Sequence, residues 1–528
     1  MKKALVYILI FAMAFGLCGC SLVSEMNQTH VTRESVNVLH LALDKDIVSP
    51  DIQAGGSEKI ASNIYSRLLK FEDAGDGSVN ITGDLAESWD ISTDGLSYTF
   101  HLREGVLFHN DEEFEADDVL FTIDRMLGSG NGEPSNEVVL RILGAYDVIY
   151  GASETVEDKG VSITDKYTVV ITLTEPWSPF LSALCDPSWS IYNRDAKETG
   201  AYSVGTGPYL FDEWVADEYV FLRVNDHYFG GKPAIDGVLY RILPLKSEQL
   251  AAFNNGELDV ISVEGEDGLV STYMKDDACS GYLVAKKELN TYFYALNQNL
   301  APFTERDVRR GLQKALDRKA LLSDAFDGQG IVLNGIIPTG MLAYNQTLPR
   351  IKNNKEEALE LIAGAGYSEG FSLTICETGL DEKESVLNQL AVSQLIDYGI
   401  NASVRTMEPA VYYNALTSGN IPMHLCCVTA TFNDPDEIIG KAFGSIGNVR
   451  HSMNIQDTGV LRRADDAVAI YDLSKRIDEY RSIEEQIVDD DASIIPLFQI
   501  YSYVLVNPRV GEFDASSDCV CNFSLNIQ

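Results

Sequence analysis

The chain has 528 residues, of which 45% are hydrophobic and 23% charged, a composition typical of a globular protein with more than one domain. Its 40 basic and 79 acidic residues give a formal net charge of −39 at pH 7. Because a surface with this excess of negative charge repels phosphate backbones and anionic lipid headgroups, we expect no nucleic-acid partner and no electrostatic attachment to a membrane.

The N-terminus has the pattern of an export signal. Two lysines precede an uncharged apolar run at residues 4–16, and the sequence Leu-Cys-Gly-Cys then ends at Cys20. This ending resembles the lipobox of bacterial lipoproteins, in which the last cysteine receives a diacylglycerol group. We therefore expect a signal peptide at 1–19, a lipid on Cys20 and a polar stalk at 20–35. An uncleaved signal anchor is the alternative, because residues 4–24 carry no charge.

Seven further cysteines fit an exported protein only in part. Their odd number leaves at least one thiol free, and their spacing matches no zinc site. Buried, unreactive thiols are the simplest interpretation for most of them, and one disulfide is possible without a choice of partners. They are Cys185, Cys279, Cys376, Cys426, Cys427, Cys519 and Cys521.

The first half of the chain mixes short strands with helices. An apolar, alternating run predicts a buried opening strand, and a turn-rich loop at 44–51 follows it. The predicted strands are 36–43, 97–102, 161–173, 219–224 and 235–243, and the predicted helices are 57–69 and a segment after Ala116.

The second half alternates strands and helices more regularly. Thr304 and Asp307 approximate a capping box, and an apolar stripe continues from there to Ala320. The predicted strands are 291–298, 371–376, 402–407, 423–430 and 494–506, and the predicted helices are a segment from Thr304, 355–365, 384–397 and 410–416. This alternation predicts an α/β protein with a parallel or mixed sheet, and it places residues 429–436 at a strand end where ligands bind. The last strand is able to return to the first domain.

Catalytic motifs are missing from the sequence. The chain contains no Walker-type phosphate loop, no HExxH and no GxSxG, and adjacent carboxylates are uninformative among 79 acids. His424 and Cys426 share one face of a predicted strand and suit a soft metal, although a buried core histidine is the competing interpretation. We expect a binding protein without enzymatic activity, metal or cofactor.

Four ordered blocks of sequence resemble one family. Residues 102–127 carry the longest block, with Arg103, Gly105, Phe108, His109, Phe114, Ala116, Asp117, Asp118 and Val119 in its pattern. The others are Gly205-Thr206-Gly207-Pro208-Tyr209, then Asn290 through Asn297 with Pro302-Phe303 and Val308-Arg309, and then Ala315-Leu316-Asp317-Arg318. Together they are similar to the extracellular solute-binding protein family 5, the oligopeptide-, dipeptide- and nickel-binding components of ABC importers.

The resemblance implies a two-lobed clamp of the type II periplasmic-binding-protein class with an inserted α+β domain. Lobe I is expected at 36–60, 181–285 and 497–528, the inserted domain at 61–180 and lobe II at 286–496. The ligand lies between the lobes, which close around it. The implied protein is a monomeric lipoprotein, in the periplasm or on the outer cell surface, that delivers an oligopeptide, dipeptide or other small solute to permease subunits. A secreted acidic hydrolase and a receptor that signals instead of transporting are the alternatives.

The ligand-binding residues follow from the same resemblance. Peptide-binding relatives have a Trp-x-x-Asp segment whose Asp pairs with the peptide amine, and here Val428 and Thr431 occupy those two positions. Either Asp434 or Asp436 then binds the amine, or the ligand lacks a free amine, which is our hypothesis. Core packing is as good an interpretation as ligand contact for Phe498. The expected ligand-binding residues are Val48, Ser49, Pro50, Asp51, Thr431, Phe432, Asn433, Asp434, Phe498 and Gln499.

Overall fold

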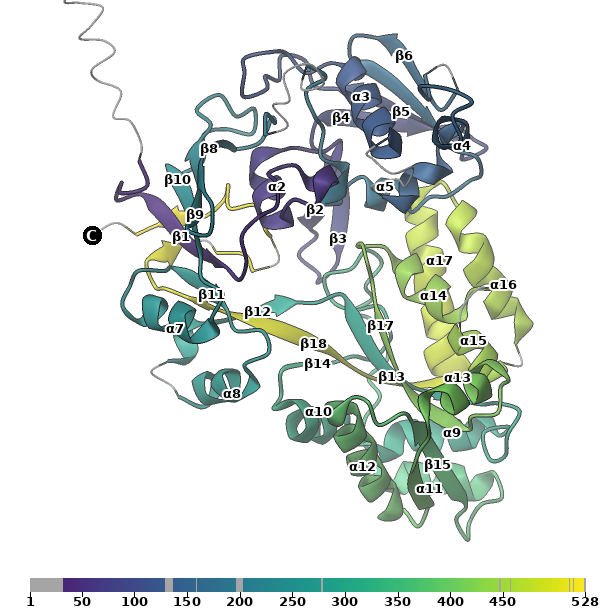
Figure 1. The fold of residues 1–528 in the computed structure, drawn as a ribbon. Helices are drawn as coiled ribbons and strands as arrows, with labels where there is room; N and C mark the ends of the chain where they lie inside the picture. Colours follow the sequence, from purple (N-terminus) through teal and green to yellow (C-terminus); the bar gives the residue numbers. More distant parts are fainter. Residues whose placement is uncertain are drawn as a thin grey trace, which may run out of the picture.

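A computed structural model describes residues 32–526, except 129–135, 158, 196–202, 277–278, 446–447, 456, 512 and 516. Its central feature is a mixed sheet of 12 strands flanked by helices, so the predicted α/β class is confirmed (Figure 1). The expected lipidation site, Cys20, lies outside the described residues. Within the described part of the chain, no helix is long and apolar enough to cross a membrane.

Runs of parallel pairs and runs of antiparallel pairs follow one another along this sheet. β15, β16 and β17 are parallel to one another, as are β1, β10 and β11, whereas β18 pairs antiparallel with each of its neighbours. In spatial order the strands are β16 (Asn401–Thr406), β15 (Ser372–Glu377), β17 (Met423–Thr429), β13 (Asn290–Leu296), β18 (Ile494–Val506), β11 (Val260–Ser262), β1 (Val38–Leu43), β10 (Gly237–Ile242), β9 (Tyr219–Val224) and β8 (Tyr209–Val215), with β12 (Leu283–Lys287) and β14 (Gly330–Val332) also paired to β18.

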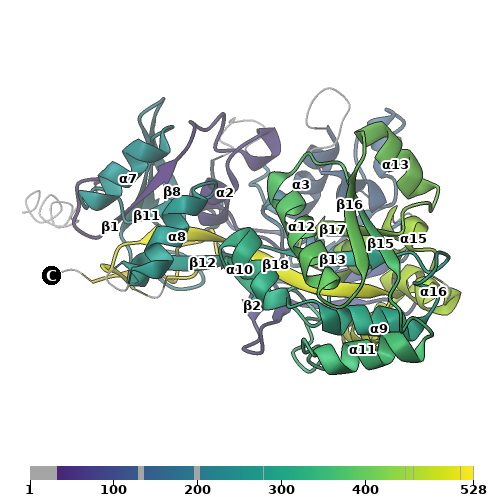
Figure 2. The same cartoon turned by 90° about the horizontal axis from the view of Figure 1, so that it is seen from below.

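The strand β18 joins the two halves of the sheet. Its first half pairs with β13 and β14, and its second half pairs with β11 and β12. In Figure 2, which shows the molecule from below, this strand runs from one half to the other. The predicted strand at 494–506 is therefore confirmed, together with its return toward the N-terminal part of the chain.

Residues 68–191 form most of a separate buried core. It covers an antiparallel sheet in the order β4-β5-β7-β6, with the hairpin β2-β3 beside it. The predicted strand at 161–173 is in fact a hairpin of two short strands. The elements here are β2 (Leu69–Asp73), β3 (Val79–Gly83), β4 (Ala86–Ile91), β5 (Ser97–Leu102), β6 (Val161–Asp165), β7 (Thr168–Thr172), α3 (Ala116–Gly128), α4 (Ala145–Ile149) and α5 (Phe180–Ala183). The domain limits themselves stay a prediction.

Two of the recognised sequence blocks lie against each other. The backbone N–H of His109 donates to Gly205 O (2.9 Å), and the Gly205 N–H donates to His109 Nδ1 (3.3 Å). A β-carbon at Gly205 would lie 1.9 Å from the carbonyl oxygen of Ile64, so only glycine fits there. The helix α2 (Glu58–Ile64) ends at this contact because Tyr65 is extended, which is why it is shorter than the predicted helix at 57–69.

The helices of the C-terminal half correct two predictions. α9 begins after Glu305, whose side chain makes no capping hydrogen bond, so the expected capping box at Thr304 is wrong. The predicted stripe to Ala320 is broken, because Leu316 is extended and Asp317 caps a second helix by accepting from Ala320 N at 3.0 Å. The helices are α9 (Arg306–Ala315), α10 (Arg318–Phe326), α11 (Lys355–Gly364), α12 (Glu382–Ile396), α13 (Pro409–Thr417), α14 (Ile439–Phe443), α15 (Asn448–Met453), α16 (Thr458–Asp466) and α17 (Leu473–Glu485), while α7 (Lys246–Asn254) and α8 (Asp267–Lys275) belong to the other half.

All seven cysteines of the folded body are free thiols. Cys185, Cys376 and Cys426 are buried, whereas Cys427 is exposed and the remaining three are partly exposed. The expectation that most of them are buried is therefore wrong. Exposure follows from alternation in a strand, since the adjacent Cys426 and Cys427 point to opposite faces of β17.

Glu484 makes stability depend on pH. This side chain is 1% exposed, and its Oε1 accepts hydrogen bonds from Ile336 N (2.7 Å) and Ile337 N (2.8 Å). Burial raises the pKa of its carboxyl from 4.5 to about 7. The folded state therefore binds a proton that the unfolded state releases between these values, and about 3 kcal/mol of stability is lost as pH rises from 4.5 to 7.

We expect Glu484→Gln to remove this loss, because the amide stays neutral and keeps the acceptor oxygen. Urea unfolding at pH 5 and pH 8 measures the difference, with Glu485→Gln as the exposed control on the same helix end. Equal pH slopes in Glu484→Gln and the unaltered protein would contradict the assignment.

Candidate binding site

The strand β17 has one edge that is only partly paired. Residues 423–429 pair throughout with β13, but on the opposite side only Met423 and His424 pair with β15. Among the described residues, no strand pairs with residues 425–429 on that side. The backbone groups of this stretch are thus free to pair with another extended segment.

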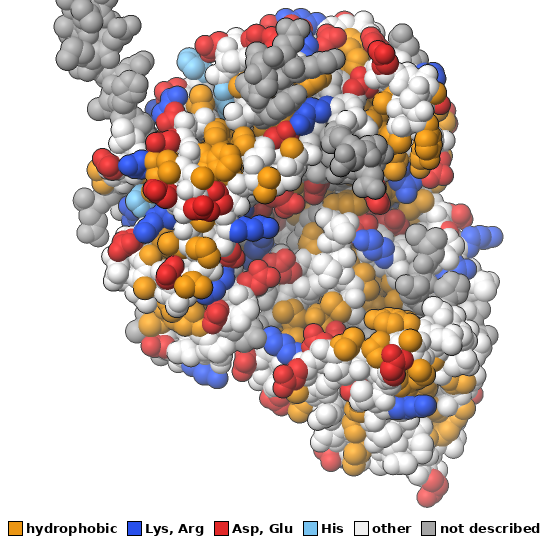
Figure 3. All heavy atoms as spheres, viewed as in Figure 1, with side chains coloured by type: hydrophobic (Ala, Val, Ile, Leu, Met, Phe, Trp, Pro, Cys, Tyr) orange, Lys and Arg blue, Asp and Glu red, His pale blue; other side chains and the backbone are white. Residues whose placement is uncertain are grey.

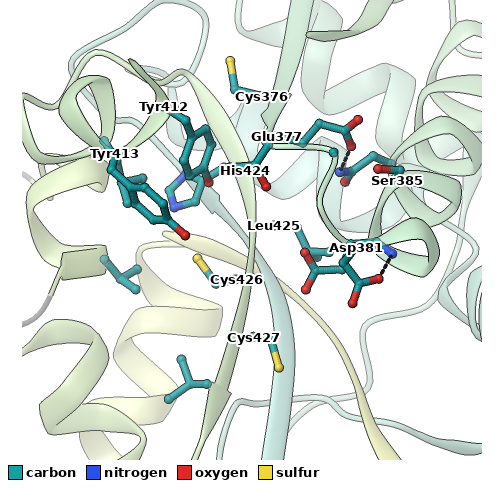
Figure 4. Close-up of a pocket in the computed structure, with 17 residues that line it drawn as sticks. Cys376, Glu377, Asp381, Ser385, Tyr412, Tyr413, His424, Leu425, Cys426 and Cys427 are labelled. Atoms are coloured by element: carbon teal, nitrogen blue, oxygen red, sulfur yellow. Dashed lines mark hydrogen bonds between the residues drawn. The ribbon is translucent and has the colours of Figure 1, made fainter. Parts of the chain in front are cut away.

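A pocket of about 280 Å³ lies along this free edge. Its walls come from the end of β15, the loop that follows, the start of α12, the helix α13 and β17 (Figure 4). The loop and α12 follow the carboxyl end of β15, where ligands of α/β proteins commonly bind. The sequence prediction placed the site at 429–436, just beyond this pocket, where β17 ends at Thr429.

Acidic side chains form one wall of the pocket. Glu377 accepts hydrogen bonds from Asn388 Nδ2 (2.8 Å) and Thr406 Oγ1 (3.0 Å). Asp381 caps α12 by accepting from Glu384 N at 3.0 Å. Burial raises the pKa of Glu384, and the nearby charges of Asp381 and Glu377 raise it further. Three carboxylates therefore share one small volume.

Aromatic and sulfur-containing side chains form the other wall. Tyr412 and Tyr413 from α13 lie edge to face, with ring centroids 5.4 Å apart, and Figure 4 shows them on the same side of β17 as His424 and Cys426. His424 is buried, and desolvation lowers its pKa to about 4. Among the described residues, no three or more His, Cys, Asp or Glu side chains are arranged so that they could hold a metal ion.

The predicted residues 431–434 have partners within the protein. The backbone N–H and hydroxyl of Thr431 donate to Glu437 Oε2, which also binds Lys441. Phe432 packs edge to face against Trp177, with centroids 6.1 Å apart. Asn433 donates to Gly340 O (2.7 Å) and accepts from Leu342 N (3.0 Å), so it holds a loop of its own half.

Asp434 is fully buried and is bound by an arginine. The two terminal guanidinium nitrogens of Arg476 donate to its carboxylate, at 2.5 and 2.8 Å, and Ser182 Oγ donates to it at 2.7 Å. Asp436 accepts from Tyr480 Oη (2.9 Å), and burial raises its pKa to about 6. Both carboxylates therefore already accept hydrogen bonds from the protein's own side chains, so neither is free to bind a ligand amine.

The predicted segment 48–51 lies in the other half. Val48 is 79% exposed, and Ser49 and Pro50 are partly exposed. Asp51 is buried, forms an ion pair with Arg125 and accepts from Tyr192 Oη at 2.8 Å. This segment and residues 431–434 therefore make their polar contacts with different parts of the chain.

Phe498 and Gln499 are fully buried in β18. The ring of Phe498 packs against Phe326 (5.4 Å between centroids) and Tyr292 (5.6 Å). Gln499 accepts from Thr339 N and Oγ1 and donates to two backbone carbonyls, Glu288 O and Thr339 O. The role of both residues in ligand binding stays a prediction, and their observed contacts are internal.

The acidic wall was missed in the sequence. Glu377, Asp381 and Glu384 are three of 79 acids, and no motif sets them apart. The only available signal was position, since all three follow the predicted strand 371–376. The face of the molecule in Figure 3 is hollowed between its upper and lower parts, and both acidic and basic side chains lie around the hollow.

Comparison with known proteins gives consistent matches. A family model described as bacterial extracellular solute-binding proteins, family 5 Middle, matches residues 80–448. Heme-binding protein A of Haemophilus influenzae is 28% identical over 489 residues, which are 88% of this chain and 86% of that protein. The dipeptide-binding protein of Escherichia coli is 27% identical over 418 residues, 75% of this chain and 76% of that protein.

Among solved structures, the periplasmic murein tripeptide binding protein MppA in its unliganded open form superposes with a TM-score of 0.80 at 18% identity. The superposition covers 93% of this chain and 97% of that one. This likeness shows the fold, a two-lobed type II binding-protein architecture.

Proposed function

Because the chain belongs to the bacterial extracellular solute-binding proteins of family 5, we propose that it is the solute-binding component of an ABC importer and that it captures an oligopeptide, a dipeptide or a similar small solute. The free edge of β17 carries this proposal. An extended peptide supplies alternating N–H and C=O groups that match such an edge, and the pocket beside it receives a side chain or a terminus.

The solute passes from this protein to membrane permease subunits. A solute that contacts both lobes stabilises the closed state, so that the permease distinguishes loaded from empty protein. A lipid on Cys20 would tether the body to the outer face of the membrane, where the stalk at 20–35 allows it to reach the permease. This proposed anchor leaves the negatively charged body free of electrostatic attachment to the lipid surface.

Binding is favoured over hydrolysis. One observation suits the alternative: a hydrolase would need two carboxylates in one pocket, and Asp381 and Glu384 line the same pocket. The relatives that support the family assignment are named as binding proteins. A receptor that signals is the remaining alternative, and a permease encoded beside this chain would favour transport.

Native mass spectrometry of the full protein, purified from its source host, tests the proposal. We expect a bound mass that tandem fragmentation identifies as a peptide or a peptide-like solute. Protein stripped of that solute should regain it from a mixture of short peptides, with closure measured as a smaller radius of gyration. A protein that carries no solute and neither binds peptides nor contracts would contradict the proposal.

A further inference from the structure

The pocket beside β17 is lined by acidic side chains. Glu377, Asp381 and Glu384 line it, and its lining, all of it among the described residues, includes no lysine or arginine. The hydrogen bonds to Glu377 and Asp381 come from neutral groups, namely two side chains and one backbone N–H. Among the residues that the structure describes, no salt bridge joins Glu377, Asp381 or Glu384 to a basic side chain.

A buried acceptor without a donor lies in the same pocket. The side chain of His424 is 4% exposed, and its Nδ1 has no hydrogen-bond partner among the described residues. Its Nε2 is 3.4 Å from Ser452 Oγ, whose own hydrogen is donated to Val449 O at 2.7 Å. Nε2 is therefore the donor of that pair, and Nδ1 is an acceptor that a ligand N–H would satisfy.

The opposite wall also suits a cation. Tyr412 and Tyr413 present aromatic rings to the pocket, and ring faces attract ammonium and guanidinium groups. Carboxylates form the strongest hydrogen bonds with the same groups. Carboxylates, tyrosine rings and a neutral histidine acceptor together match a positively charged nitrogen with several N–H donors.

We propose that this pocket binds an ammonium or guanidinium group carried by the solute. The inference rests on the proposed function, since the rest of the solute is taken to be a peptide lying along β17. It also replaces the family's amine-binding acid, because Thr431 is not acidic and both Asp434 and Asp436 have internal partners. The cation is either the peptide's α-amine, which would reverse the sequence-based hypothesis that the ligand lacks a free amine, or a lysine or arginine side chain.

Isothermal titration calorimetry of the full protein with four tripeptides tests the proposal. The probes are Ala-Ala-Ala, Ala-Lys-Ala and their N-acetylated forms, which vary the α-amine and the side-chain ammonium independently. We expect acetyl-Ala-Ala-Ala to bind at least about tenfold more weakly than the best cationic probe. Preference for Ala-Ala-Ala over acetyl-Ala-Lys-Ala assigns the pocket to the α-amine, and the reverse preference assigns it to the side chain.

Equal affinities for acetyl-Ala-Ala-Ala and the cationic probes would overturn this inference and leave the proposed function standing. Failure of all four probes to bind would overturn the peptide proposal and this inference with it. The two failures are therefore distinguishable.

Charge-removing variants locate the effect in the pocket. Glu384→Gln and Asp381→Asn remove one charge each, and asparagine keeps the cap of α12. We expect the preference for cationic probes to shrink about tenfold, while the affinity for acetyl-Ala-Ala-Ala stays unchanged. Glu382→Gln, an exposed position on the same helix that does not line the pocket, is the matched control. An unchanged preference in both pocket variants would overturn the assignment.

Discussion

Replacing Asp434 with asparagine is expected to lower the free energy of unfolding by about 3–5 kcal/mol. Arg476 is 1% exposed and Asp434 is fully buried, so the variant leaves a guanidinium charge in the interior without its carboxylate. The amide also loses one of the two acceptor oxygens that bind the arginine nitrogens. The desolvation of the remaining charge is then no longer offset.

Urea unfolding measures this loss, and two further variants identify its cause. In Asp147→Asn the exposed ion pair with Lys159 is lost, for which we expect about 1 kcal/mol or less. In the double variant Asp434→Leu/Arg476→Met both buried charges are absent, so we expect part of the stability to return. If Asp434→Asn kept full stability and lost only solute binding, Asp434 would be a ligand residue and the structural role would be wrong.

This ion pair also illustrates what sequence patterns leave out. Asp434 and Arg476 are 42 residues apart, and Ser182, which donates to the same carboxylate, comes from 252 residues away. Periodicity and turn residues are local signals, so they predicted the strands at 97–102, 219–224 and 494–506 at their observed bounds. The partner of a buried charge is a property of tertiary packing, which no local signal carries.

The pocket was not predicted from the sequence either, for a different reason. The strand 371–376 and the helix after it were predicted, yet their acids became a site only through the short pairing of β15 with β17. Because that pairing stops at His424, the next residues of β17 keep a free edge. Register is fixed by side-chain packing across the sheet, and a sequence without an alignment does not reveal where a ladder ends.

The recognised sequence blocks identify the scaffold more than the site. Arg309 donates to the backbone carbonyls of Phe303, Asp491 and Ala492, and Arg318 donates to those of Leu333, Ile351 and Pro496. His109 holds the glycines at 205 and 207. These residues fix loops in place, which explains why the family was recognisable while the solute was not.

Phe498→Ala distinguishes a core-packing role of this side chain from a ligand-binding role. We expect the variant to lower the free energy of unfolding by about 3–5 kcal/mol. The ring is fully buried between Tyr292 and Phe326, in the strand that connects both halves of the sheet. Truncation leaves a cavity that rigid strands on both sides fill only in part.

Ile331→Ala is the matched control, because Ile331 is 39% exposed and lies in the same ladder, opposite Gln499. We expect its cost to be about 1 kcal/mol or less. Calorimetry on the folded fraction of Phe498→Ala at low temperature then measures solute affinity separately from stability. A packing role predicts unchanged affinity, because the ring has no exposed surface for a solute to contact. Loss of affinity without loss of stability would instead make Phe498 part of the binding wall, and the sheet would have to open there to admit the solute.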